Sequence, residues 1–346
     1  MTVQQITLLP RDPTVARFSA SRWIPFLVFC LVAVAAIYVH TSRWNKGENI
    51  EGQDIYYIFV EGSRLVAGVN PYERVLNGNM RQNDKYATYL PLFFLFSASA
   101  QLAGLDTFPA WLALWRVVFL GCNIGIGYLI FRICAARSQP LLGIFGALFW
   151  LFNRWTLLVT LIDHIDFIPL FVLLLSLSLV PRRFPLACIL FGLSLAIKQI
   201  GILALPLYLI WSWQTAREDR VRHLLTASGL ILVIPLAVSL PFLIWNAEGF
   251  VRSILFSATR YPDDHFDAPS LDALFGAYGI PAKIPLLLLL SLTYALASLQ
   301  RVPVYASLLL VMSAFFGFNS VLFRQYVVWF IPFIPLAVLE ARDQPG

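Results

Sequence analysis

Charged residues are scarce in this chain and apolar residues are abundant. Of the 346 residues, 13% are charged and 59% are hydrophobic. Several apolar runs approach the roughly 20 residues that a helix needs to cross a bilayer. A soluble globular protein is excluded, because it could not bury that much apolar surface. The formal net charge of +6 does not indicate a nucleic-acid partner, since the basic residues lie at the ends of apolar runs, where they act as topology signals.

Cysteine is also rare. The four cysteines all fall within apolar runs and show no CxxC spacing, which excludes a disulfide framework and a zinc site. The chain has no soluble domain, linker or low-complexity segment that we can identify. It also has no clear inverted repeat, so the usual sequence indication of a transporter site is missing.

The first apolar run covers residues 23–40 and follows Arg11, Arg17 and Arg22. This arrangement resembles a signal peptide, and residues 33–35 resemble a cleavage site. The run is long, however, and further apolar runs follow it. We therefore predict an uncleaved first span after a cytoplasmic tail of residues 1–22.

The positive-inside rule decides the second span. If residues 90–105 crossed the membrane, Arg132 and Arg137 at the end of the next run would lie outside. These arginines lie inside if residues 90–105, interrupted by Pro91 and Gly104, stay at the outer interface and residues 109–134 make the crossing. We therefore predict an external loop of residues 41–108.

Residues 185–213 have basic residues beyond both ends, which predicts a hairpin of two short helices that turns near Lys198. The other expected spans are residues 141–161, 165–180, 224–245, 284–299, 302–318 and 325–339. The fold class is thus an all-α membrane protein of about ten transmembrane helices, with amphipathic juxtamembrane helices in the first external loop. One polytopic domain, residues 23–341, contains a second external loop at 246–281 and precedes an inner tail at 342–346.

Polar and ionisable residues within a membrane usually have a functional role. In the predicted topology, most of these residues lie on the outer side. In the first loop, Asp54, Tyr57, Glu61 and Arg64 have helical spacing and share one face of a predicted surface-lying helix. The other face is apolar and consists of Ile55, Ile58, Phe59, Gly62, Leu65 and Val66. Asp54 is either the N-cap of that helix or a carboxylate that accepts a proton from an attacking hydroxyl.

Lys198 and Arg324 each have two interpretations. Lys198 lies within an apolar run and either extends to the interface or holds a phosphate. Arg324 is either an interface anchor or a ligand of a lipid phosphate through its planar guanidinium. His164 and Asp166, in the sequence IDHIDF, either shape a helix turn or form a polar wall for a substrate. His265 lies in the sequence DDHFD, which we interpret as a solvated loop rather than a metal site.

Six short motifs carry a family resemblance. DIYY from Asp54, GVNPY ending at Tyr72 and YLPL from Tyr89 resemble the first external loop of the GT-C class of membrane glycosyltransferases. HID from His164, GLSLAIKQ ending at Gln199 and RQYVVWFIP from Arg324 also resemble stretches of these enzymes. The similarity is greatest to bacterial mannosyltransferases that use polyprenyl-phosphate mannose. Where these relatives have a double proline after tyrosine, this chain has Leu90 and Pro91.

The resemblance implies an inverting glycosyltransferase in the cell (inner) membrane, with its active site on the extracytoplasmic side. It implies that Asp54 is the general base and that the donor is a polyprenyl-phosphate-linked sugar, with mannose expected. The acceptor is a lipid or cell-envelope glycan, and the expected partners include membrane lipids but no nucleic acid. The donor is itself the lipid-phosphate sugar, so we expect no cofactor and no metal.

The candidate substrate-binding residues are Lys198, Arg324, Gln325, Tyr57, His164, Asp166, Gln199 and His265. Two other classes stay open. A transporter or flippase of a lipid-linked glycan would carry polar residues along a path through both halves of the bilayer, with Arg116 as the main candidate at mid-span. A membrane scaffold without catalysis would not need an ionisable residue such as Lys198 within an apolar run.

Overall fold

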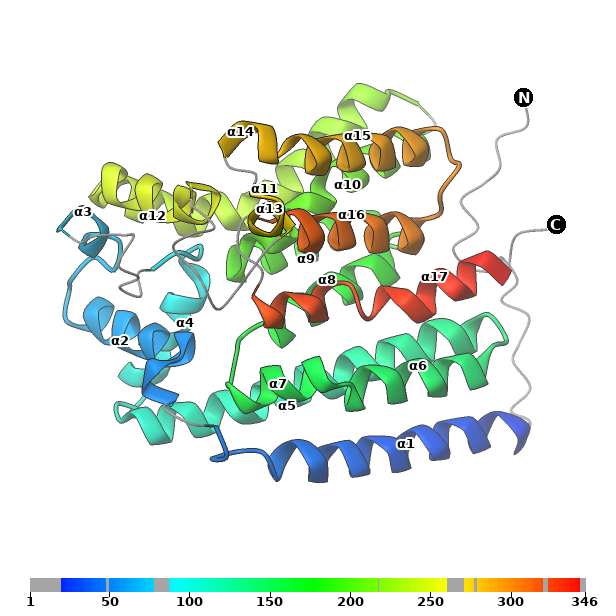
Figure 1. Cartoon of the computed structure of the whole chain (residues 1–346), viewed down its shortest axis with the longest axis horizontal. Coiled ribbons are helices and arrows are strands. Elements are labelled where there is room, and N and C mark those ends of the chain that lie inside the picture. Colours follow the sequence, from blue (N-terminus) through cyan, green and yellow to red (C-terminus); the bar gives the residue numbers. More distant parts are fainter. Residues whose placement is uncertain are drawn as a thin grey trace.

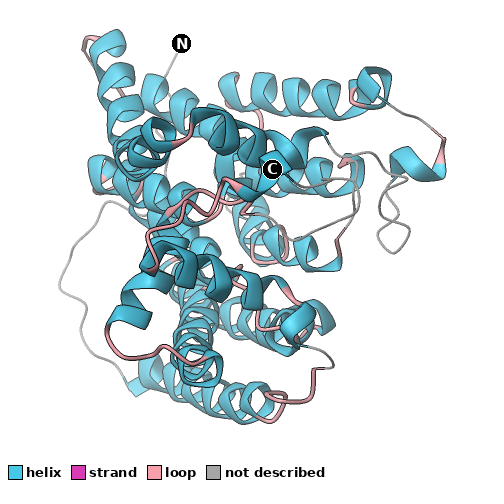
Figure 2. Ribbon diagram, turned by 90° about the vertical axis from the view of Figure 1, so that its left-hand side faces the viewer, coloured by secondary structure: helices cyan, strands magenta, loops and turns pink. Residues whose placement is uncertain are grey.

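A computed structural model describes residues 20–47, 50–77, 87–216, 218–259, 271–276, 279–319 and 323–342. Within these ranges all regular elements are helical (Figure 2). The long helices run side by side along the longest axis of the molecule (Figure 1). The start of α1 and the end of α17 lie at one end of this bundle, and α2, α3 and α4 lie at the other. The all-α fold predicted from the sequence is therefore confirmed.

The elements of the first half are α1 (Ala20–Thr41), η1 (Ile50–Gly52), α2 (Asp54–Val66), α3 (Arg74–Asn77), α4 (Leu92–Leu102), α5 (Phe108–Ala136), α6 (Pro140–Phe152), α7 (Arg154–Leu161) and α8 (Phe167–Leu179). Those of the second half are α9 (Phe184–Ile197), η3 (Gln199–Ala204), α10 (Leu205–Thr215), α11 (Arg220–Trp245), α12 (Ala247–Thr259), α13 (Leu271–Leu274), α14 (Gly279–Ala282), α15 (Ile284–Ser298), α16 (Val304–Phe318), η5 (Arg324–Trp329) and α17 (Phe333–Arg342).

Among the described residues, three helices are long and apolar enough to cross a membrane: Trp23–Thr41, α5 and α11. The helices α6 and α7 pass the same test as a pair, with a bend of 43° between them. Five more helices are apolar but shorter, α4, α8, α9, α15 and α16. These features are those of a membrane protein, whereas the count of about ten spans stays a prediction.

The predicted hairpin around Lys198 is present. The ring of Tyr208 in α10 stacks on Phe191 in α9, with 4.2 Å between their centroids. At the open end, the ring of His223 stacks on Phe184 at 5.4 Å and its Nδ1 lies 2.9 Å from the Ser212 hydroxyl. The start of α9 and the end of α10 thus meet the same residue, and Lys198 lies at the closed end of the hairpin.

The bend between α6 and α7 is stabilised by side chains that replace the interrupted helical hydrogen bonds. Nδ2 of Asn153 donates to the carbonyl oxygens of Phe149 and Trp150, at 3.0 and 2.8 Å, and its Oδ1 accepts from two amides of α7. Nε2 of His40 lies 2.8 Å from the carbonyl oxygen of Leu151. A membrane offers no water for such groups, so these bonds are what permits α7 to turn here.

The helix α2 confirms the predicted amphipathic pattern and corrects two details. Its apolar residues Ile55, Ile58 and Gly62 are buried, and the helix packs against α4. The N-cap is Gln53, and Asp54 is the first helical residue, so the interpretation of Asp54 as the cap is wrong. Glu61 is buried rather than exposed on a polar face, because Arg74 binds it at 2.6 Å.

The last predicted span, residues 325–339, is not one helix. Residues from Arg324 to Trp329 form the 3₁₀ segment η5, three residues of turn follow, and α17 begins at Phe333. The apolar run has the length of a span, but Pro332 lacks the backbone N–H and clashes with the preceding turn of an α-helix. The interruption brings the side chains of η5 into the site described below.

The contact between α9 and α11 requires glycine. A Cβ on Gly192 would lie 2.2 Å from the carbonyl oxygen of Ile231, whereas a Cβ on Gly229 of α11 would meet nothing within 4 Å. We expect Gly192→Ala to lower the free energy of unfolding by about 1–3 kcal/mol through overpacking. Gly229→Ala is the matched control, and we expect it to be neutral or slightly stabilising. Thermal unfolding in detergent, followed by tryptophan fluorescence, checks both, and equal unfolding temperatures for the two variants would contradict the close helix contact.

Candidate active site

Polar side chains from four distant segments meet at the end of the bundle where α2 lies (Figure 1). They are Asp54 at the start of α2, His164 and Asp166 between α7 and α8, Lys198 after α9, and Trp329 at the end of η5. Each of these segments is a helix end or a helix break, where side chains can leave the apolar packing of the bundle.

Asp166 is the buried anion at the centre of this group, with no exposed surface. Its Oδ1 accepts from Nζ of Lys198 at 2.6 Å and from Nε1 of Trp329 at 2.8 Å. Lys198 is itself 1% exposed. A buried ammonium needs an anion close by, and Asp166 supplies it.

His164 connects Asp166 to Asp54. Its Nδ1 lies 2.7 Å from Oδ2 of Asp166, and its Nε2 lies 3.3 Å from Oδ2 of Asp54. Two carboxylates within 3.3 Å of its ring nitrogens favour the protonated imidazole. The four side chains therefore form a row of alternating charge, Asp54, His164, Asp166 and Lys198.

The pKa shifts agree with this alternation. Burial and the Lys198 ammonium lower the pKa of His164, but the Asp166 carboxylate and the hydrogen bonds to Asp166 and Asp54 raise it more, and it ends above its usual value. Burial raises the pKa of Asp166, yet Lys198 and His164 hold it well below its usual range. These directions favour a protonated His164 beside an ionised Asp166.

Asp54 is the member of the row that reaches solvent, because 27% of its side chain is exposed against 4% of the His164 side chain. Its Oδ2 also accepts from the phenol of Tyr89 at 3.2 Å. Burial and the neighbouring Asp54 carboxylate raise the pKa of Tyr89 well above its usual value, so the phenol keeps its proton and donates. Two donors thus orient one carboxylate at the edge of the site.

The GVNPY motif explains how Tyr89 is held. Oδ1 of Asn70 accepts from the backbone N–H of Tyr72 at 2.9 Å, which shapes the turn around Pro71. The fully buried Tyr72 then donates its hydroxyl to the carbonyl oxygen of Tyr89 at 2.7 Å. The Tyr72 ring packs edge-on against Phe250 of α12, with 4.9 Å between centroids. The motif therefore anchors the segment that carries Tyr89 next to Asp54.

Aromatic rings surround the Lys198 ammonium. Its Nζ lies 5.2 Å from the ring centroid of Tyr89 and 5.7 Å from that of Tyr326 in η5. Both distances are within the range of cation–π attraction. The next residue, Gln199, donates from Nε2 to the carbonyl oxygen of Thr88 at 2.6 Å, and so fixes the chain before Tyr89 to the tip of the hairpin.

The remaining predicted residues are less tightly connected to the row. Arg324 is exposed at the first position of η5 and forms no ion pair with any described residue. Gln325 is half-buried beside Tyr326. Tyr57 is half-buried one turn after Asp54, and its ring packs edge-on against Tyr56 with 5.8 Å between centroids. His265 lies outside the described residues.

Sequence reasoning missed the aromatic members of this site. Tyr89 and Trp329 both stand in motifs that resemble the GT-C enzymes, but nothing in their spacing indicates that their polar atoms point at carboxylates. A signal was available for Trp329, because η5 ends one helical turn before α17 and Pro332 separates the two. A break of this kind inside an apolar run often places polar groups in a site.

The chain is similar to GPI mannosyltransferase 1 of Gibberella zeae, with 27% identity over 318 residues. The alignment covers 81% of this chain and 70% of that protein. No protein-family model matches the chain. No solved structure matches it.

Proposed function

We propose that this membrane protein is a mannosyltransferase of the GT-C type. Two independent observations support the proposal: the similarity to GPI mannosyltransferase 1 over 81% of the chain, and the row of charged side chains that ends in a partly exposed Asp54. The second observation carries the chemistry, because a carboxylate that is oriented by two donors at the edge of a buried polar site suits a general base.

Asp54 accepts a proton in the proposed reaction. As the hydroxyl oxygen of the acceptor attacks the anomeric carbon of the sugar, its proton moves to the Asp54 carboxylate. The bond between the anomeric carbon and the phosphate oxygen breaks, and its electron pair leaves with the lipid phosphate. His164 stabilises the ionised form of Asp54 before transfer, since its Nε2 lies 3.3 Å from Oδ2. Attack from the face opposite the leaving group inverts the configuration at the anomeric carbon.

The leaving phosphate gains negative charge, and Arg324 is the residue that we propose to bind it. Arg324 is exposed, and its planar fork suits two phosphate oxygens at once. Lys198 acts differently, because its ammonium is already bound to Asp166 at 2.6 Å. We propose that Lys198 stabilises the Asp166 anion, which in turn holds His164.

The donor in this proposal is a polyprenyl-phosphate-linked mannose, and the acceptor is a lipid or glycan of the cell envelope. The lipid chain would lie along apolar helix surfaces of the bundle while the sugar reaches Asp54. We further propose that the site faces the extracytoplasmic side of the cell (inner) membrane. The start of α1 and the end of α17 then lie on the inner side, since both are at the opposite end of the bundle from α2 (Figure 1).

An assay with purified protein in membranes tests the proposal. We expect radiolabelled polyprenyl-phosphate mannose to yield a labelled product only when both the protein and envelope lipids are present. A dolichol-linked donor in a parallel reaction tests the choice of lipid. If the label moves between leaflets without forming a product, the protein is a flippase; if the label does neither, the mannosyltransferase proposal fails.

A further inference from the structure

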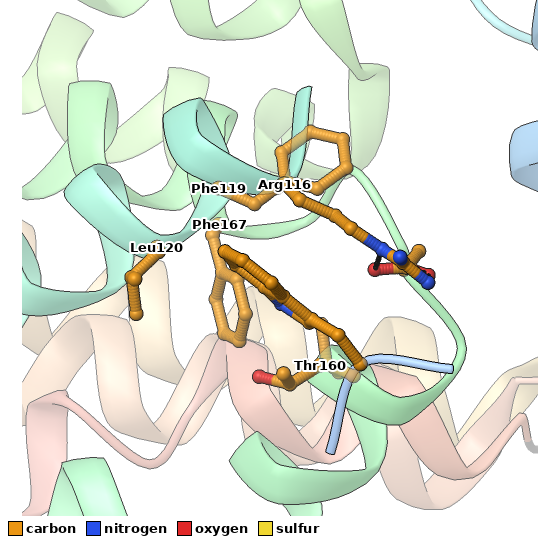
Figure 3. A pocket seen from close by; sticks show the side chains of 8 residues that line it. Arg116, Phe119, Leu120, Thr160 and Phe167 are labelled. Carbon is orange, nitrogen blue, oxygen red and sulfur yellow. Dashed lines mark hydrogen bonds and ion pairs between the residues drawn. The ribbon is translucent and has the colours of Figure 1, made fainter. Parts of the chain in front are cut away.

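Arg116 of α5 binds Asp163, which precedes His164, and Asn45, in the turn after α1. Figure 3 shows Arg116 among the side chains that line a small pocket. Its Nε lies 3.0 and 3.1 Å from the two carboxylate oxygens of Asp163, and its Nη2 lies 2.8 Å from Oδ2. Its Nη1 donates to Oδ1 of Asn45 at 2.7 Å, and the ring of Trp44 lies 5.8 Å from the guanidinium carbon. The Arg116 side chain is 11% exposed and the Asp163 side chain 3%, so solvent screens this ion pair only weakly.

The two residues that Arg116 holds share an unusual backbone conformation. Asp163 has a φ of 50° and Asn45 a φ of 64°, both in the left-handed region. For a residue other than glycine this conformation costs about 1–2 kcal/mol, although aspartate and asparagine tolerate it best. Such strain persists where surrounding contacts fix the backbone, and it is frequent at functional sites.

Asp163 immediately precedes His164, whose two ring nitrogens face Asp54 and Asp166. The backbone N–H groups of Asp163 and His164 bond to the last turn of α7, at Thr160 and Val159. These bonds fix where the turn starts. The side-chain bonds from Arg116 then fix the peptide that determines the direction of the His164 ring, and they tie it to α5, which spans the length of the bundle.

We propose that Arg116 and Asp163 are positioning residues that hold the His164 ring between Asp54 and Asp166. The inference rests on the proposed function for its catalytic consequence, and on geometry alone for the position of the ring. It accounts for Arg116 without a path through the membrane, because each guanidinium nitrogen donates to Asp163 or Asn45.

Kinetics of four variants test the catalytic consequence. We expect Arg116→Gln and Asp163→Ala to lower kcat about 100-fold, the size of effect that a displacement of about 1 Å produces, with KM changed less than about twofold. Arg116→Lys keeps the positive charge but loses the planar guanidinium, so it should retain more activity than Arg116→Gln. Asp163→Asn keeps a hydrogen-bond acceptor and tolerates the left-handed backbone, so it should retain more activity than Asp163→Ala. Arg132→Gln is the matched control, since Arg132 also lies on α5 and, among the described residues, bonds to Tyr128 of the same helix. A purely structural pair would reduce the folded yield and leave kcat of the folded fraction unchanged, and that result overturns the proposal.

A second measurement does not depend on activity. The sequence contains 4 histidines, so the imidazole signals of ¹⁵N-labelled protein in detergent can be assigned by single replacement. The charged groups that act on His164 are Asp54 of α2, Asp166, and Lys198 after α9, and the phenol of Tyr89 before α4 bonds to Asp54. In the wild type the pKa of His164 should lie above its usual value, and in Arg116→Gln it should fall toward that value because the ring leaves its carboxylates. If the pKa of His164 is the same in Arg116→Gln as in the wild type, the positioning role is overturned, even if the protein has no transferase activity. If the wild type has no transferase activity but the pKa of His164 shifts as expected, only the proposed function fails.

Discussion

Asp54→Asn is expected to lower kcat by about 10²–10⁴-fold, the contribution of a general base, while the protein still folds. The amide oxygen of asparagine can accept from Tyr89 and His164 as the carboxylate does, with Tyr89 at 3.2 Å and His164 at 3.3 Å. The amide cannot accept the proton of the acceptor hydroxyl. Initial rates with labelled lipid-linked mannose, normalised to folded protein, give the comparison.

Glu51→Gln is the matched control for Asp54→Asn. Glu51 lies three residues earlier on the chain, in η1, and is exposed. The replacement removes the same charge without touching the row, so activity should stay near that of the wild type. Near-normal transfer by Asp54→Asn would remove the assigned base and with it the reaction proposed above.

Asp166→Asn is expected to lower the free energy of unfolding by about 3–5 kcal/mol, the cost of leaving a buried charge without its partner. The ammonium of Lys198 is 2.6 Å from Asp166, and its side chain is 2% exposed, so it cannot turn to water without moving the hairpin tip. Activity should fall as well, since His164 loses the carboxylate at its Nδ1. Denaturation of purified protein in mixed detergent micelles measures the first effect.

Two further variants make this experiment decisive. Lys198→Met combined with Asp166→Asn removes the unpaired charge, and we expect it to regain part of the lost stability but none of the activity. Glu340→Gln is the matched control at α17, because Glu340 is buried and accepts from the backbone N–H groups of Tyr305 and Ala306 at 2.9 and 3.1 Å. The amide oxygen can accept the same bonds, so we expect a loss of about 1 kcal/mol and normal turnover. If Asp166→Asn is as mild as Glu340→Gln, then Lys198 does not depend on Asp166.

The features predicted correctly from the sequence are local. The spacing of Ile55, Ile58 and Gly62 predicted which face of α2 is buried. Basic residues beyond both ends of the run 185–213 predicted the hairpin that turns at Lys198. Such signals survive without tertiary information because the helical period and the preference of charge for one side of a membrane act along a few turns of chain.

The errors and omissions concern contacts between distant segments. Glu61 was placed on a polar face, and it is buried because Arg74 reaches it from α3. The N-cap of α2 was one of two interpretations of Asp54, but the N-cap is Gln53 and Asp54 is the first helical residue. A helical-face argument finds Arg64, three residues after Glu61 on the same helix, but it cannot find Arg74, which lies on α3.

The sequence by itself determined that the chain is helical and that its apolar runs suit a membrane, and it predicted that its few ionisable residues mark a site. Only the tertiary structure decided that Asp54 and His164, 110 residues apart, and Asp166 and Trp329, 163 residues apart, share that site. The physical reason is that apolar periodicity specifies which residues leave water but not which of them meet. The pairing of buried charges depends on distances of about 3 Å, which the packing of whole helices sets.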